Sequence, residues 1–141
     1  MRLTRYTDFS FRVLFYLAVN QNRAVPISEI AEAYDVSQNH FVKVVHHLVK
    51  TGYLLSVRGR HGGVSLARPV TEISLGEVVR CTEPELRILD CMGCVIAEFC
   101  TLPHPMQEAL NAFVEVLDKY TLDDIIKDSR GLEGFLYSQV S

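Results

Sequence analysis

The chain has 141 residues, of which 48% are hydrophobic and 22% are charged, enough for one core and a satellite helix but hardly for two independent domains. Residues 1–7 hold two arginines and no continuous apolar run, so we expect no signal peptide, no transmembrane segment anywhere and a cytoplasmic protein. Thiols stay reduced in that compartment, so the four cysteines are expected to be ligands or redox groups rather than disulfides.

The net charge of −3 conceals an uneven distribution along the chain. Residues 1–69 hold nine lysines and arginines against four acids, a net +5, whereas residues 70–141 hold five against thirteen, a net −8. A basic half fits a polyanionic partner, although a solvated surface can carry the same excess. Charge alone is therefore weak evidence for nucleic-acid binding.

Three helices are predicted in the first part of the chain. Apolar residues recur at helical intervals over residues 8–20, and a break around Pro26 follows. Ser28 is predicted to cap a short second helix. After a tight turn, Ser37 is predicted to cap a third helix, which Gly52 ends. The second and third helices together form a helix-turn-helix pattern.

The polar face of the third predicted helix carries side chains that suit DNA. Asparagine and glutamine can pair with adenine edges in the major groove, lysine suits phosphate oxygens, and the early residues of a recognition helix reach the bases. A solvated polar face is the alternative interpretation. The candidate DNA-contacting residues of this segment are Ser37, Gln38, Asn39, His40, Lys43, His47 and Lys50.

Residues 53–57 and 64–66 are predicted to form two short strands joined by a glycine-rich basic loop. The glycines permit a tight turn, and Arg58, Arg60 and His61 place hydrogen-bond donors at its tip. A basic hairpin directly after a helix-turn-helix predicts a winged helix, whose tip can enter a minor groove or contact phosphates. A mobile surface hairpin with incidental charge is the alternative.

Further helices are predicted in the acidic half. Ser74 begins a capping-box pattern for a short helix that runs to about Cys81. From Met106 to Tyr120, apolar residues follow one stripe over about four turns. We interpret this segment as a dimerisation helix, with a coat over the winged domain as the alternative. Thr121 is predicted to cap a terminal helix.

Three thiols within ten residues, those of Cys91, Cys94 and Cys100, lie in a segment that prolines bracket and that is expected to be irregular. Three thiolates can hold three corners of an iron-sulfur cubane and leave the fourth ligand open. A zinc site with His104 as fourth ligand fits the same spacing. Cys81 could replace one thiol, but a small buried residue near a helix end explains it better.

Segments 1–4, 7–9, 37–43, 57–63 and 120–124 together resemble the winged-helix iron-sulfur regulators. That family includes nitric-oxide-sensing repressors and the cluster-biogenesis regulator IscR. The resemblance covers nearly the whole chain and implies a homodimeric repressor whose affinity for palindromic promoter DNA is set by its cluster, with 4Fe-4S favoured over 2Fe-2S. The first interval between thiols is usually longer in the family than the one between Cys91 and Cys94 here. Cys81 therefore stays a candidate to replace one of these two ligands.

The resemblance implies two candidates for the fourth ligand. In the nitric-oxide-sensing members an aspartate near the N-terminus of the other subunit completes the site, and Asp8 matches it. In the IscR-like members a histidine closely follows the last cysteine, and His104 stands four residues after Cys100. The N-terminal segment resembles the nitric-oxide-sensing type, so Asp8 is preferred and His104 is the weaker alternative. Asp8 could instead be the N-cap of the first helix.

The sequence therefore predicts a mainly α fold with a small β-hairpin wing: a winged helix-turn-helix domain plus a long dimerisation helix. We expect a DNA-binding domain at 1–80 (wing about 53–68), a cysteine-rich cluster-binding loop at 81–104, and dimerisation and C-terminal helices at 105–141. The resemblance implies that nitric oxide reacting with the cluster releases the repressor from DNA. The alternatives are a cluster-status, iron- or redox-responsive regulator of the same family and a zinc-binding winged-helix regulator.

Two other classes of protein are disfavoured. A redox enzyme with Cys91 and Cys94 as a dithiol pair would normally need a βαβ unit, which the pattern lacks. No glycine-rich phosphate loop and no Ser-His-Asp arrangement are visible, so we expect no catalytic residues and no enzyme. A metal-free adaptor whose wing binds protein stays a third alternative, which salt-sensitive DNA binding would exclude.

Overall fold

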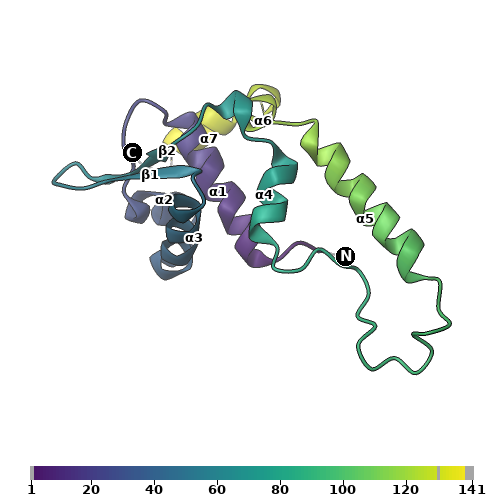
Figure 1. Ribbon diagram of the computed structural model, residues 1–141. Coiled ribbons are helices and arrows are strands. Elements are labelled where there is room, and N and C mark those ends of the chain that lie inside the picture. The colour runs from purple at the N-terminus through teal and green to yellow at the C-terminus, as the bar shows by residue number, and fades with distance from the viewer. Residues whose placement is uncertain (1, 130, 139–141) are drawn as a thin grey trace.

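The computed structural model describes residues 2–129 and 131–138, which form a mainly helical fold with one antiparallel hairpin (Figure 1). The helices are α1 (Arg5–Val19), α2 (Ile27–Ala33), α3 (Gln38–Lys50), α4 (Leu75–Thr82), α5 (Pro103–Asp118), α6 (Leu122–Asp128) and α7 (Leu132–Ser138), with a short 3-10 helix η1 (Val70–Glu72). The strands are β1 (Leu54–Val57) and β2 (Gly63–Leu66). The predicted fold class is confirmed. Residue 1 of the expected segment 1–80, and residues 130 and 139–141 of the expected segment 105–141, lie outside the described residues.

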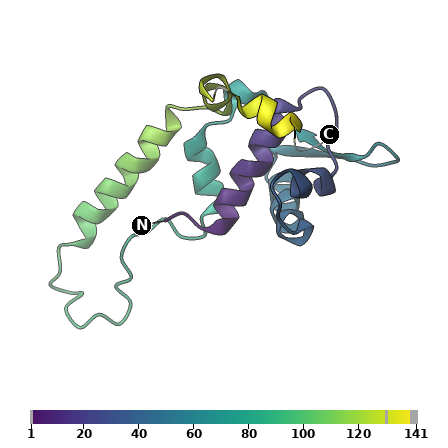
Figure 2. The same cartoon turned by 180° about the vertical axis from the view of Figure 1, so that it is seen from behind.

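The elements form a winged-helix body and an arm that leads away from it (Figures 1 and 2). The body contains α1, α2, α3 and the hairpin, and both α4 and α6 pack against α1. The arm consists of α5 and the loop before it, residues 83–102, which extends to the far end of the molecule. Arg80 of α4 forms an ion pair of 2.6 Å with Asp118 at the end of α5, which ties the arm to the body. No helix in the described part of the chain is long and apolar enough to cross a membrane.

The core lies between α1 and α3. Phe41, Val44, Val45 and Leu48 of α3 are all buried, as their helical spacing predicts, and they belong to one cluster with Leu14 and other residues of α1. Burial of a large aliphatic or aromatic side chain stabilises a fold by about 1.5–3 kcal/mol. The α1–α3 contact therefore fixes the rotation of α3 about its own axis.

Two predicted helix starts are wrong. α1 begins at Arg5, not at Asp8, because the hydroxyl of Thr4 accepts the backbone N–H of Thr7 and caps the helix there. Asp8 lies in the first turn of α1, so its alternative role as the N-cap is also wrong. α2 begins directly after the extended Pro26, so Ser28 lies within its first turn instead of capping it.

The predicted wing is a hairpin whose second strand is tied to the segment before α2. The two strands pair antiparallel, and each predicted range differs from the observed strand by one residue. Val64 exchanges two backbone hydrogen bonds with Val25, with N···O distances of 2.8 and 2.9 Å. A Cβ on Gly63 would lie 2.3 Å from the carbonyl oxygen of Val25, so the close approach requires glycine. The base of the wing is thus fixed to the helix-turn-helix.

The long helix α5 is shifted from its predicted range. It begins at Pro103 rather than near Met106, because proline at the first helical position loses no hydrogen bond. It ends before Tyr120. Thr121 and Asp124 form a capping box at the start of α6, as predicted for Thr121. The last described helix, α7, was not predicted.

We predict that Phe41→Ala lowers the free energy of unfolding by about 3–5 kcal/mol, because it removes a fully buried ring and leaves a cavity between α1 and α3. Urea denaturation followed by circular dichroism measures the change. Val42→Ala is the matched control, because the side chain of Val42, next to Phe41 in sequence, is 42% exposed. Its truncation should change the free energy of unfolding by no more than about 0.5 kcal/mol. Equal effects at the two positions would contradict the assigned rotation of α3.

Candidate functional site

The side of α3 that faces away from the core presents polar side chains to solvent. This follows from the burial of Phe41 and Leu48, which hold the opposite side of the helix against α1. Six of the seven residues predicted to contact DNA in this segment are exposed. These six are Ser37, Gln38, Asn39, His40, Lys43 and Lys50. Their arrangement gives α3 a solvent-facing row of amides, imidazole and ammonium groups.

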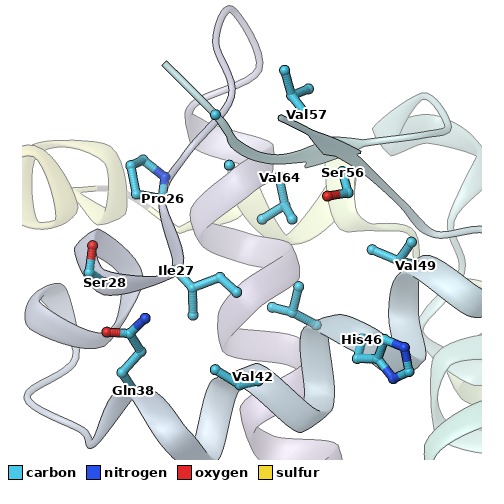
Figure 3. A pocket seen from close by; sticks show the side chains of 13 residues that line it. Pro26, Ile27, Ser28, Gln38, Val42, His46, Val49, Ser56, Val57 and Val64 are labelled. Atoms are coloured by element: carbon cyan, nitrogen blue, oxygen red, sulfur yellow. The ribbon is translucent and has the colours of Figure 1, made fainter. Parts of the chain in front are cut away.

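Val42 and His46 are also exposed on α3, although the sequence analysis did not include them among the DNA-contacting candidates. They follow Gln38 at intervals of four residues and border a hollow of about 500 Å³ between α3 and the wing (Figure 3). Figure 3 shows these three side chains along one side of the hollow and Val57 of β1 across it. The four-residue spacing from Gln38 was the signal that could have identified His46.

His47, the seventh candidate, is half-buried and lies against other helices. Its Nε2 atom lies 3.2 Å from the carbonyl oxygen and 3.4 Å from the Sγ atom of Cys81, at the end of α4. The ring of Tyr6 in α1 meets the imidazole edge to face, with ring centroids 5.7 Å apart. Burial raises the pKa of the Tyr6 hydroxyl, with a smaller contribution from the neighbouring Cys81. The structure therefore separates His47 from the exposed candidates on α3.

The wing tip is exposed and basic. Arg58, Arg60 and His61 are all solvent-exposed at the turn between β1 and β2. The hairpin projects from the body beyond α3 in both views (Figures 1 and 2). Guanidinium groups at such a tip can donate several hydrogen bonds to phosphate oxygens or enter a minor groove.

The cysteine loop, residues 83–102, contains neither helix nor strand, and its turns are confined to residues 92–93, 95–99 and 102. Cys94 is exposed, Cys91 and Cys100 are half-buried, and all four cysteines of the described chain have free thiols. The backbone N–H of Cys94 bonds the carbonyl of Cys91 at 3.2 Å. His104 is exposed in the first turn of α5. The exposed large apolar side chains of the loop are Ile88, Met92, Val95, Ile96, Phe99 and Leu102.

Within residues 2–129 and 131–138, no three His, Cys, Asp or Glu side chains gather closely enough to hold a metal ion. The three thiols of the loop are therefore neighbours in sequence but do not converge on one point. Asp8, the preferred fourth ligand, lies on α1 in a hollow that Arg2, Thr4 and Phe11 help to line.

The carboxylate of Asp8 is exposed and pairs with the guanidinium of Arg12, one turn later in α1, at 2.9 Å. The same guanidinium lies over the rings of Phe9 and Tyr34, 5.7 and 5.6 Å from their centroids. Burial raises the pKa of Tyr34 to about 12, and its hydroxyl donates to the carbonyl of Arg12 at 3.0 Å. Asp8 is thus linked through Arg12 to the turn that follows α2.

Phe9, the residue after Asp8, contacts the beginning of α3. Its ring stacks on His40 with centroids 5.5 Å apart, and it lies 5.3 Å from the ring of Phe41. The first turn of α1 therefore touches both the exposed and the buried side of α3.

Glu83, at the start of the cysteine loop, is fastened to the N-terminus of α1. Its Oε1 atom accepts hydrogen bonds from the backbone N–H of Thr4 at 2.8 Å, from the Thr4 hydroxyl at 3.0 Å and from the Thr7 hydroxyl. The hydroxyl of Thr82 lies 2.9 Å from that of Thr7. No local pattern could have identified Glu83, because its partners are 76 and 79 residues away.

These features define a winged helix-turn-helix transcriptional regulator. The chain belongs to the Rrf2 family: the family model, described as an iron-dependent transcriptional regulator, matches residues 3–128. The protein therefore belongs to a class of regulators and not of enzymes, as the sequence predicted.

Two relatives carry the name HTH-type transcriptional regulator NsrR. The NsrR of Bacillus licheniformis is 44% identical over 132 residues, covering 89% of this chain and 92% of the relative. The NsrR of Bacillus subtilis strain 168 is 44% identical over 138 residues, covering 94% of each chain. The predicted resemblance to this family, and within it to NsrR, is confirmed.

Solved structures of two other regulators have the same fold. T. potens IscR superposes with a TM-score of 0.77 at 27% identity, covering 92% of this chain and 89% of that one. The oxidized form of Staphylococcus aureus CymR gives a TM-score of 0.72 at 25% identity, covering 89% and 95% of the two chains. The likeness extends over the body and the arm, because it spans most of each chain.

We predict that Glu83→Ala lowers the free energy of unfolding by about 1–3 kcal/mol, because the buried hydroxyl of Thr7 loses its acceptor. Chemical denaturation measures the loss. Glu83→Gln keeps an acceptor oxygen and should lose less. Glu85→Ala is the control, since this exposed carboxylate pairs only with Arg87 among the described contacts; a similar loss there would show that Glu83 is no special anchor.

Proposed function

We propose that this chain is a homodimeric repressor that binds palindromic promoter DNA, carries an iron-sulfur cluster and leaves the DNA when nitric oxide reacts with that cluster. One observation carries the proposal: a winged helix and three free thiols in an exposed loop occur in the same chain. The names of the NsrR relatives and the description of the family as iron-dependent support it. In this proposal residues 1–80 bind DNA, residues 81–104 hold the cluster, and residues 105–141 join the subunits.

DNA binding is assigned to α3 and the wing. The amides near the start of α3 suit base edges in the major groove, while the lysines of α3 and the arginines of the wing suit phosphates. The net charge of +5 on residues 1–69 favours this side of the molecule for a polyanion. The proposed contacts are Ser37, Gln38, Asn39, His40, Lys43, His46, Lys50, Arg58, Arg60 and His61.

The donor set of the cysteine loop fits an iron-sulfur cluster. Soft thiolates are the usual ligands of such clusters, and a loop without helix or strand can rearrange to bring Cys91, Cys94 and Cys100 around one centre. When bound, a cluster would supply iron that reacts directly with nitric oxide. The three thiols would hold three corners, and the 4Fe-4S type is favoured because it offers a fourth corner to another ligand.

Asp8 of the partner subunit is the proposed fourth ligand, with His104 as the weaker alternative. An exposed carboxylate in the first turn of a helix is accessible to a second chain. If Asp8 held iron, its carboxylate would divide its charge between the iron and the guanidinium of Arg12, and its release would leave Arg12 as its ion-pair partner. Because Phe9 follows Asp8 and stacks on His40, this exchange would act on the beginning of α3.

Dimerisation is assigned to α5. Leu110 and Val114 are the buried residues of this helix, whereas Leu102 at its start and Val116 near its end are 46% and 50% exposed. A helix that extends from the body with apolar residues on its open side can pair with a second copy in an isologous interface (Figure 1). Pairing through α5 would also bring each cysteine loop near the partner.

We predict that the wild-type protein, purified without oxygen, contains iron and sulfide and loses operator affinity on the order of 10-fold when nitric oxide is added. Asp8→Ala should alter the absorption spectrum of the cluster and reduce that loss, because a ligand of the cluster is missing. Iron and zinc analysis, spectroscopy and fluorescence anisotropy on palindromic DNA provide the measurements.

Asp128→Ala, which removes an exposed carboxylate from α6, is the charge-matched control and should behave as wild type. A colourless protein with one zinc ion per chain would reject the cluster hypothesis and support a zinc-binding regulator. An iron protein that ignores nitric oxide but responds to iron supply or redox state would favour the iron- or redox-responsive alternative. An unchanged spectrum and response in Asp8→Ala would remove Asp8 as a ligand.

We predict that Arg58→Ala and Arg60→Ala each weaken DNA binding and make the negative slope of log K against log salt shallower by about 0.9, as expected when one phosphate contact is lost. Titrations at several salt concentrations measure the slope. Lys119→Ala removes one exposed positive charge at the end of α5, far from the wing, and should leave the slope unchanged. Wild-type slopes in all three variants would exclude the wing from the interface.

A further inference from the structure

His47 joins α3 to the last turn of α4. Its Nε2 atom lies 3.2 Å from the carbonyl oxygen of Cys81. The last four carbonyl groups of a helix have no N–H partner within that helix, and the carbonyl of Cys81 is one of them in α4. A hydrogen bond from Nε2–H of His47 supplies the missing donor. The Sγ atom of Cys81, at 3.4 Å, and the edge of the Tyr6 ring enclose the same imidazole. The imidazole is therefore held by both α1 and α4.

The turn of α4 that His47 contacts leads directly into the cysteine loop. Thr82 is the last residue of α4, and Glu83 follows as its C-cap and the first residue of the loop. Both are bonded to the threonines at the start of α1. A displacement of the loop that reaches Thr82 would therefore be passed to the carbonyl of Cys81, the residue before it, to which His47 bonds.

We propose that His47 is a positioning residue that couples the cysteine loop to α3, and that it makes no contact with DNA. The inference rests on the proposed function, because coupling requires a loop whose ligand state changes. When the last turn of α4 shifts, the imidazole transfers the shift to the second half of α3, which presents His46 and Lys50 to solvent. Phe41 and Leu48 of α3 pack into the core with α1, so a shift applied to one part of this closely packed helix is passed along it.

The neighbouring residue His46 supplies a matched comparison. Successive residues of an α-helix point about 100° apart, so His46 is exposed beside the hollow next to the wing while His47 is half-buried. The two positions share residue type and helix. They differ in whether the imidazole contacts α4 or solvent.

The test compares His47→Leu, His47→Gln and His46→Leu with the wild type. For each, the affinity for palindromic DNA is measured by anisotropy with and without the cluster at fixed salt, and the ratio of the two affinities is calculated. Coupling in regulators typically gives a ratio of about 5–150. We expect His47→Leu to bring the ratio to within about twofold of one, with the cluster spectrum and the salt slope as in wild type. His47→Gln retains an N–H donor and should restore part of the ratio.

His46→Leu should instead weaken both affinities and leave the ratio unchanged. A wild-type ratio in His47→Leu, or a loss of affinity and salt slope like that of His46→Leu, would overturn the inference. Thermal melts of all variants verify folding, and His47→Gln tests the coupling if His47→Leu fails to fold. A wild-type protein with no cluster, or with a ratio of one, would overturn the proposed function itself, an outcome distinct from failure of His47 alone.

Discussion

The packing of α3 against α1 is the interaction on which the rest of the structure depends. Phe41 and Leu48 are fully buried in the cluster that contains Leu14 of α1. Because burial of this row fixes the rotation of α3, it decides which side chains can meet a polyanion. It also brings Phe9 against His40, so the first turn of α1 and the first turn of α3 form one contact region. The hairpin adds to this unit through its backbone bonds to the segment before α2.

The N-terminal turn of α1 joins three features that are far apart in sequence. Thr4 and Thr7 bond to Glu83, where the cysteine loop begins. Asp8 is exposed in the same turn, and Phe9 contacts α3. If the loop binds a metal centre and α3 contacts DNA, as we propose, this turn of α1 lies between the two. The connection consists of part-buried hydrogen bonds to Glu83 and of ring contacts of Phe9, and packed groups of this kind deform little.

Local patterns predicted much of the fold and part of the candidate site. The apolar spacing of α3, the stop at Gly52 and the capping box at Thr121 all act over a few residues, and the structure has each of them. The predicted start of α1 was wrong, because the hydroxyl of Thr4 caps the helix and Asp8 lies inside its first turn. The prediction was also wrong at the start of α5, because the apolar stripe begins at Met106 whereas the helix begins at Pro103, a residue that suits a first helical position.

The sequence by itself determined the fold class, the basic wing, the polar face of α3 and the three neighbouring thiols, because periodicity, capping and spacing are local along the chain. Only the tertiary structure decided that His47 is held by α4 and that Glu83 anchors the cysteine loop to α1. The physical reason is distance along the chain. The His47–Cys81 contact joins residues 34 apart and the Thr4–Glu83 bond joins residues 79 apart, so both depend on how the helices pack and not on any local pattern.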